Sequence, residues 1–317
     1  MAEIYHGRGA VIGFAEESTW GTAIAAGSIN NYRPLVSSNL LRTIEKVPRP
    51  HLQVGTAGAI RRSHYIQNDN AGGTFVVEAS YSSIGMLLKH LMGSVAKTGT
   101  GPFTHTFTLA DDVPTGLTMA NIRGTGTCET FEGCRITQGT FNVAAGGVMT
   151  AEFEVIAETS SARASYGGTV AISATDAPIL HSHAGQLSFN GTNYDLVDLT
   201  LTVNNALSVR QHLGSAATKK PLRSDFGSVE LALTLEVSDT AYAAFTADSV
   251  GDAEITFTSG ADAFQIALHN AYMSEASDPV SDANVIQQSI TLVGQSDGTD
   301  HGVRITTVNG NSSSTAN

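Results

Sequence analysis

The chain has 317 residues, of which 41% are hydrophobic, 15% are charged and 32 are glycine, and its formal net charge at pH 7 is −12. Glycine and small β-permissive residues are abundant while Lys and Glu are scarce, which excludes a helical bundle, a coiled coil and a disordered acidic chain. The acidic balance also excludes a protein that wraps nucleic acid with a basic surface.

The first half of the chain shows the two-residue alternation of apolar and polar side chains that is typical of strands. One segment differs: between Ser82 and Met92 the apolar residues recur every three or four positions, and Gly93 follows as a suitable helix end. We therefore expect a helix at 82–92 and strands at about 32–46, 73–80, 103–109, 130–143 and 147–158.

The second half repeats this order. Strands are expected at about 193–209, 228–237, 253–258, 263–274 and 285–294, with a helix at 238–247. In both halves a loop with basic residues follows the first strand and a short helix follows the second. This match favours two copies of one β-fold, although all-β chains can share such an order without duplication.

The regions between and beyond these elements complete the expected organisation. Residues 159–169 are rich in Ser, Ala and Gly, as a linker would be. Residues 302–308 alternate and predict one more strand, available to a neighbour's sheet, and residues 309–317 hold nothing to bury. The first 30 residues and the segment after Ser296 are expected to become ordered only on assembly. The expected division is an N-terminal arm (1–30), a first β domain (31–159), a linker or crossover (160–192), a second β domain (193–295), and a C-terminal strand with a flexible tail (296–317).

The sequence holds few groups that suggest catalysis or metal binding. His181 and His183 have the spacing of two imidazoles on one strand face, but no Cys or carboxylate cluster adjoins them, so solvated histidines are the simpler interpretation. Cys128 and Cys134 lack the second pair of a zinc site and are expected to be reduced, packed thiols. No Walker A, G-x-S-x-G or H-E-x-x-H motif occurs. We therefore expect no enzyme activity, no cofactor and no metal site.

Targeting signals are also absent from the sequence as given. Residues 1–9 are polar and lack the apolar core of a signal peptide. No apolar run approaches the roughly 18 residues that a membrane-spanning helix needs. We expect synthesis in the cytoplasm and no membrane insertion.

In a strand-rich chain of this kind, the backbone N–H and C=O groups at the sheet edges need hydrogen-bond partners. An open edge in a monomer is an aggregation hazard. Strands from several subunits that close into a ring satisfy such edges, and rings that stack head to tail form a tube. Basic loops on one ring face and acidic residues on the other would supply salt-sensitive docking.

Residues 11–23, Val-Ile-Gly-Phe-Ala-Glu-Glu-Ser-Thr-Trp-Gly-Thr-Ala, resemble the opening of tail tube (major tail) proteins of long-tailed, non-contractile bacteriophages. In that family an apolar-Gly-x-x-x-Glu-Ser-x-aromatic-Gly-Thr segment precedes a strand and a charged strand extension, which here correspond to residues 32–38 and 39–46. The expected helix position also fits. The resemblance is strongest over residues 11–95, and the second half is supported only through its strand order.

The resemblance implies an all-β fold with short flanking helices and two packed antiparallel sheets per tube fold. The inner sheets would join around a ring into a β-barrel lumen, and tubes of this kind present six such folds per ring. Two copies per chain would need three chains in a pseudo-hexameric ring, which we favour. One elaborated copy per chain would need six.

The resemblance further implies a lumen along which DNA passes without binding, and therefore side chains that do not pair with phosphate. Candidates on the strands expected to line it are Glu78, Glu230 and Glu236. Charged groups in the loops are candidates for contacts between rings: Arg42, Glu45, Lys46, Arg49, Arg61, Arg62, Lys219, Lys220 and Arg223. Ordinary solvated charge is the simpler alternative for all of them.

A tail tube protein would be part of the virion, assembled in the bacterial cytoplasm. Its implied partners are further copies of itself and the tape-measure, tail terminator and distal tail proteins, with only transient, non-specific passage of DNA. The alternative from another class is a carbohydrate- or receptor-binding β-sandwich, which would be a compact monomer or small oligomer with an aromatic-lined groove. The sequence has a single Trp in 317 residues, whereas a sugar-binding groove usually needs several aromatic rings on which sugars can stack.

Overall fold

A computed structural model of the chain describes residues 9–48, 64–124, 126–172, 176–236, 249–277, 287–296 and 302–313. Nearly all regular structure in these ranges is antiparallel β-sheet, which confirms the expected fold class. The helical elements are α1 (Gly85–Met92) and the short 3-10 helices η1 (Ala26–Ser28) and η2 (His181–His183). The helix expected at 238–247 lies outside the described residues. No helix in the described ranges is long and apolar enough to cross a membrane.

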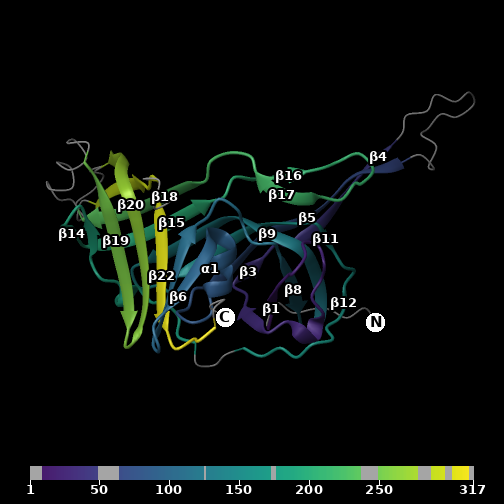
Figure 1. Ribbon diagram of the computed structural model, residues 1–317, viewed down its shortest axis with the longest axis horizontal. Helices are drawn as coiled ribbons and strands as arrows, with labels where there is room; N and C mark the ends of the chain where they lie inside the picture. Colours follow the sequence, from purple (N-terminus) through teal and green to yellow (C-terminus); the bar gives the residue numbers. More distant parts are fainter. Residues whose placement is uncertain are drawn as a thin grey trace, which may run out of the picture.

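One sheet runs through the whole molecule and takes strands from both halves of the chain (Figure 1). We call it the long sheet. In spatial order its strands are β3 and β4 (Ser37–Ser38, Leu41–Pro48), β5 (His64–Glu78), β10 (Thr150–Ala157), β9 (Thr127–Ala144), β15 (Leu196–Asn204), β18 (Ser228–Glu236), β21 (Gln287–Val293) and β20 (Asp262–Ser277). Because β3 and the first part of β4, as far as Glu45, pair with β5 in the same register, they act as a single edge strand.

The N-terminal parts of β9 and β20 continue beyond the long sheet and pair with further strands, which form the second layer. Around β9 these are β8 (Leu117–Arg123), β1 (Val11–Glu16), β2 (Asn31–Pro34), β11 (Thr159–Ser160) and β12 (Ala164–Ser165). Around β20 they are β19 (Val250–Ser259), β13 (Leu187–Phe189), β14 (Thr192–Tyr194), β22 (Val303–Asn309), β7 (Phe103–Leu109) and β6 (Gly93–Thr98). A separate hairpin, β16 (Leu207–Arg210) and β17 (Lys219–Arg223), projects from the end of β15.

The pattern of strand pairing occurs twice. The order β4–β5–β10–β9–β8 in the first half corresponds to β15–β18–β21–β20–β19 in the second. The outer neighbours also correspond, because β1 pairs with β8 as β13 pairs with β19, and β1 pairs with β2 as β13 pairs with β14. Among the described residues, the β6–β7 hairpin that follows α1 in the first half has no counterpart in the second. Strands β9 and β15 join the two sets into one sheet.

A large apolar core fills the space between the layers and extends through both halves, and a smaller cluster that includes Tyr32 and Ile122 lies apart from it. The alternation found in the sequence explains it, since Phe75, Phe141 and Phe153 point inward from neighbouring strands of the long sheet while their chain neighbours point out. The ring centroids of Phe14 in β1 and Phe75 in β5 lie 5.7 Å apart, so the second layer packs directly against the long sheet at this point.

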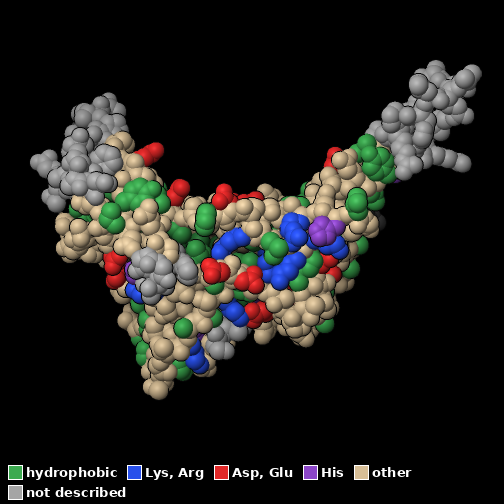
Figure 2. Space-filling view, turned by 45° about the horizontal axis from the view of Figure 1, so that its top comes forward, with side chains coloured by type: hydrophobic (Ala, Val, Ile, Leu, Met, Phe, Trp, Pro, Cys, Tyr) green, Lys and Arg blue, Asp and Glu red, His purple; other side chains and the backbone are tan. Residues whose placement is uncertain are grey.

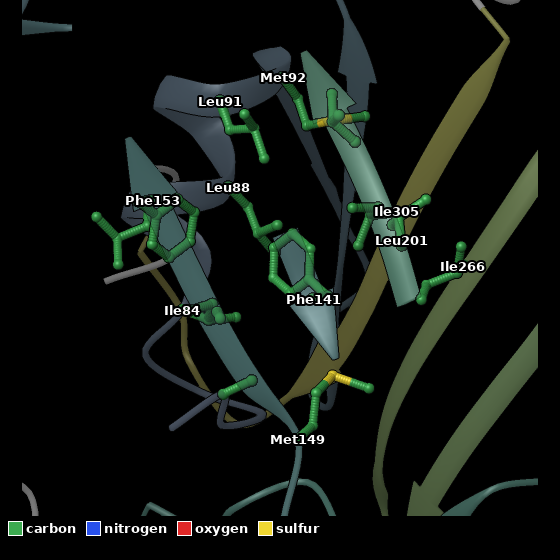
Figure 3. Close-up of a cluster of buried hydrophobic side chains, with 14 of the residues drawn as sticks. Ile84, Leu88, Leu91, Met92, Phe141, Met149, Phe153, Leu201, Ile266 and Ile305 are labelled. Atoms are coloured by element: carbon green, nitrogen blue, oxygen red, sulfur yellow. The ribbon is translucent and has the colours of Figure 1, made fainter. Parts of the chain in front are cut away.

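Helix α1 covers this core at the junction of the halves. Figure 3 shows its side chains Leu88 and Leu91 directed toward Phe141 and the neighbouring strands. The helix comes so close to β9 that a Cβ added at Gly139 would lie 2.4 Å from a Leu91 methyl carbon. Gly93 ends the helix with φ of +101°, a conformation that favours glycine, as the sequence predicts.

Two expectations about the chain ends are wrong. Residues 11–16 of the expected arm form β1, with Ile12 and Phe14 fully buried. Strand β22 pairs with β20 and β7 of its own chain and adds nothing to a neighbour's sheet. At the end of this strand, Asn309 is 1% exposed and donates to the Tyr81 carbonyl at 2.7 Å. Both segments therefore belong to the folded chain before any assembly.

Candidate functional site: the polar face and edges of the long sheet

The long sheet has one face that the second layer does not cover. In β10, Ala151, Phe153 and Val155 are buried in the core while Glu152 and Glu154 are exposed on the opposite face. The pairing registers place further carboxylates on that face, which we call the polar face: Glu78 of β5, Asp198 of β15, Glu230 and Glu236 of β18, and Glu275 of β20.

Between the carboxylates the polar face carries mainly small neutral side chains. The β9–β15 junction shows their character, because Asn142 Nδ2 donates to Thr200 Oγ1 at 2.7 Å across it. No Lys or Arg is exposed on the polar face of the described strands between β5 and β20. Arg135, just past the bulge in β9, is 2% exposed and donates to backbone carbonyls, among them that of Pro221 at 2.9 Å. The charged side chains exposed on the polar face of these strands are therefore all acidic, which makes its potential negative.

The sequence named three of these residues, and the structure places all three on the polar face: Glu78, Glu230 and Glu236 are exposed there. It missed Glu152, Glu154, Asp198 and Glu275. The alternation of β10 and β15 was visible in the sequence. Their position beside β5 and β18 depends on pairings between residues far apart in the chain.

Within the part of the chain that the structure describes, neither lateral edge of the long sheet has a further strand partner. Leu41 and its neighbours in β4 pair only with β5, and residues 273–277 of β20 pair only with β21. Apolar side chains are exposed along the first edge, with Val36 57% and Leu41 53% accessible. Open edges with exposed apolar residues are a site for further strand pairing.

Two hairpins extend from one end of the long sheet, and most of the charged loop candidates lie on them. In the β4–β5 hairpin Arg42 forms a two-point ion pair with Asp69, at 2.6 and 2.7 Å, and Glu45 accepts from Asn68. Lys46 is exposed. Arg49, Arg61 and Arg62 lie outside the described residues.

In the β16–β17 hairpin Lys219 and Lys220 are half-buried. Arg223 donates to the Ala110 carbonyl at 2.8 Å and to Asn205 Oδ1 at 3.0 Å. Arg42 and Arg223 therefore both bind partners within the chain. Exposed apolar side chains gather on the same two hairpins and in the connection that follows β17: Ile44, Tyr65, Ile66, Val209, Leu213, Leu222 and Phe226.

In Figure 2 several acidic side chains lie along the hollowed upper border of the molecule, where no basic side chain is seen, and others lie on the side turned to the viewer. Basic side chains gather on the side turned to the viewer, mixed with acidic and apolar ones. The two signs of charge are therefore unequally distributed over the surface.

The segment that carried the family resemblance has a clear structural role. Glu17 is 2% exposed and accepts hydrogen bonds from Gly21 N, Thr118 Oγ1 and Gly133 N at 2.8–2.9 Å. Trp20 Nε1 donates to the Gly133 carbonyl at 3.0 Å. The Glu-Ser-x-aromatic-Gly part of the motif thus forms a turn that fastens β1 to β8 and β9.

Residues that suggested other chemistry are engaged in packing. His183 Nδ1 lies 2.9 Å from the Tyr81 hydroxyl. Cys128 and Cys134 are buried free thiols, and burial raises the pKa of both. No group of three potential metal ligands occurs within the described ranges. A cavity of about 190 Å³ beside Arg33 and Asp176 is lined without an aromatic ring, unlike a sugar-binding groove.

Comparison with known proteins identifies this architecture. The family model described as phage tail tube protein matches residues 7–294, nearly the whole chain. None of the curated proteins compared with the chain matches it. The extent of the family match shows that the chain belongs to the phage tail tube protein family, and that it is a structural protein of the virion tail.

Proposed function

We propose that three copies of this chain close into a ring, and that rings stack into a hollow tube through which the phage genome leaves. One observation carries the proposal: β9 and β15 join two equivalent sets of strands into one sheet within the chain. The same junction between chains would continue the sheet around a circle. Two sets of strands per chain make a pseudo-hexamer of three chains, whereas six chains would require one set per chain.

Closure of the long sheet determines which face lines the channel. The second layer and α1 cover the other face, so the polar face is the one that can surround an empty lumen. Its carboxylates repel the phosphates of DNA, and repulsion by a narrow wall prevents the genome from adhering during passage. This role requires no bond chemistry.

Stacking would use the two hairpins, which the repeated pairing pattern places in equivalent positions. Their exposed apolar side chains supply contact area, and Glu45, Lys46, Lys219 and Lys220 supply charges that fix the register. Arg49, Arg61 and Arg62, which lie outside the described residues, remain proposed members of this interface. The tape-measure protein would occupy the lumen, and the tail terminator and distal tail proteins would cover the two ends of the tube.

Electron microscopy of the purified protein tests the proposal. Tubes or rings with three-fold symmetry in end-on views, containing three chains by mass, would support it. Rings of six chains would refute the pseudo-hexamer, and a stable compact monomer at high concentration would favour the carbohydrate- or receptor-binding alternative.

A further inference from the structure

The correspondence between the two halves extends to single residues. Strand β9 has a bulge at Thr137, and β20 has one at Ser274. Thr137 Oγ1 donates to the Glu154 carbonyl at 3.1 Å, and Ser274 Oγ donates to the Thr291 carbonyl at 3.2 Å. Because bulges fix the local register of a sheet, these two residues align β9 with β20.

The partner strands align in the same way. The next strands outward from the bulge are β10 and then β5 in the first half, and β21 and then β18 in the second. In this alignment Gly72 of β5 corresponds to Glu230 of β18. Their next neighbours are Leu41 in β4 and Thr202 in β15. Residues 41–43 of the open edge therefore correspond to residues 202–204.

The pairing inside the chain then specifies the pairing outside it. Within the chain Thr202, Val203 and Asn204 lie opposite Thr140, Gly139 and Gln138. In β20 the residues equivalent to Thr140, Gly139 and Gln138 are Ser277, Ala276 and Glu275, in that order. We infer that Leu41, Arg42 and Thr43 of one chain pair antiparallel with Ser277, Ala276 and Glu275 of the next. This inference rests on the ring closure proposed above.

The two edges are suited to each other. Among the described strands, residues 41–43 and 275–277 have a partner on one side only, so their outer backbone groups are available for pairing with the next chain. Thr43 and Glu275 are exposed on the polar face, where the Thr43 hydroxyl can donate to the carboxylate, in the place where Asn204 donates to Gln138 within the chain. Ala276, like Gly139, is small, and it leaves room for the longer residue opposite. Leu41, now 53% accessible, becomes covered along its edge.

Engineered cysteine pairs test the register. Leu41→Cys with Ser277→Cys and Thr43→Cys with Glu275→Cys place two thiols directly opposite each other between chains. Leu41→Cys with Glu275→Cys is the matched control, displaced by two residues. Directly opposite Cβ atoms lie about 4.5–5.5 Å apart and displaced ones about 7–8 Å, beyond the reach of a disulfide. The native cysteines are buried and give little background.

In assembled tubes under mild oxidation, at least one matched pair should cross-link at least ten times more than the displaced pair. The ladder on a non-reducing gel should end at the covalent trimer. Intact three-fold tubes in which the displaced pair cross-links best, or in which no pair does, would overturn the register while leaving the proposed function intact. Absence of rings in the unmodified protein would instead refute the proposed function.

Hydrogen exchange on the unmodified protein gives a second test that needs no variant. Amides within residues 41–43 and 275–277 should exchange at least ten times more slowly in tubes than in the unassembled chain. Equal rates at these positions in well-formed tubes would overturn the inferred pairing.

Discussion

Lys89 Nζ lies 2.5 Å from the Glu16 carboxylate, an ion pair that ties helix α1 to the end of strand β1. His90, 3% exposed, places its Nε2 atom 3.3 Å from the same carboxylate. His90 and Lys89 lower the pKa of Glu16 from 4.5 to about 2, against the opposing effect of burial. Burial lowers the pKa of His90 in turn.

These shifts predict acid sensitivity. Below pH 4.5 the unfolded chain binds a proton at Glu16 while the folded chain does not, so the stabilisation is lost as the pH falls toward 2. The lowered pKa of His90 likewise makes the folded chain less stable as the pH falls. Burial raises the pKa values of Glu132 and Glu158, so their contributions oppose this loss. Glu16→Gln should cost about 1–2 kcal/mol at neutral pH, given the partial exposure of the pair, and should flatten the loss below pH 4.5. Urea unfolding of the unassembled chain from pH 7 to 3 measures both effects, and an unchanged slope would contradict the assignment.

Glu17 should be essential to the stability of the N-terminal turn. Glu17→Ala leaves the amides of Gly21 and Gly133 without their acceptor in a buried site, and we expect a loss of about 2–4 kcal/mol. The exposed Glu152→Ala on the polar face is the control and should change stability by less than about 0.5 kcal/mol. Denaturant unfolding of the unassembled chains compares the two. Equal effects would show that the hydrogen bonds of Glu17 do not hold the turn.

Truncation should separate the last strand from the residues beyond it. A chain that ends at Gly302 lacks β22, which leaves β7 and β20 with open edges and removes the buried Val303 and Ile305. We expect loss of soluble expression. A chain that ends at Gly310 keeps the strand and should remain soluble, with a modest loss from the missing Asn311 contacts to Ser82 and His105. Soluble yield and light scattering distinguish the two, and a soluble, folded 1–302 chain would contradict the role of β22.

Charge reversal on the polar face should impair the channel while leaving the tube intact. Glu154→Lys with Glu230→Lys would attract phosphate, and we expect DNA ejection to slow several-fold at low salt and to recover as salt screens the attraction. Glu254→Lys, exposed on β19 in the second layer, is the matched control. Fluorescence of released DNA from variant phages measures the rate. Ejection at the normal rate from phages with normal tails would contradict a lumenal position for these carboxylates.

Glu45 tests the contact between rings. Glu45→Lys places a second cation beside Lys46 and should shorten tubes or reduce their yield at low ionic strength, where charges are least screened. The deficit should diminish as salt is added. Tube lengths from negative-stain images, again with Glu254→Lys as the control, provide the measurement. Tubes of normal length at every salt concentration would remove Glu45 from this interface.

The alternation of apolar and polar residues predicted most of the strands, and helical spacing predicted α1 with its end at Gly93. The signal was sufficient because one face of each such element is buried. It failed for β1, where residues 11–15 are nearly all buried and show no alternation. Alternation did predict β22 as a strand, but it carries no information on the strand's partners, which are β20 and, from the first half of the chain, β7.

The charged loop residues show a second limit of the sequence. Arg42 and Arg223 looked like the other basic residues of their loops, yet each is held by its own chain, at Asp69 and at Asn205. Only the folded arrangement separates such structural charges from free ones. The polar face likewise emerges from strand pairings that place Glu154 and Asp198 on one surface although they come from different halves.

The position of β22 also constrains the order in which the molecule is made. Strand β22 lies between β7 and β20, and so pairs one strand from each half of the chain. The nascent polypeptide therefore cannot complete this part of its second layer until residues 303–309 have left the ribosome. Nascent chains that stop before residue 303 lack the strand that joins their two halves.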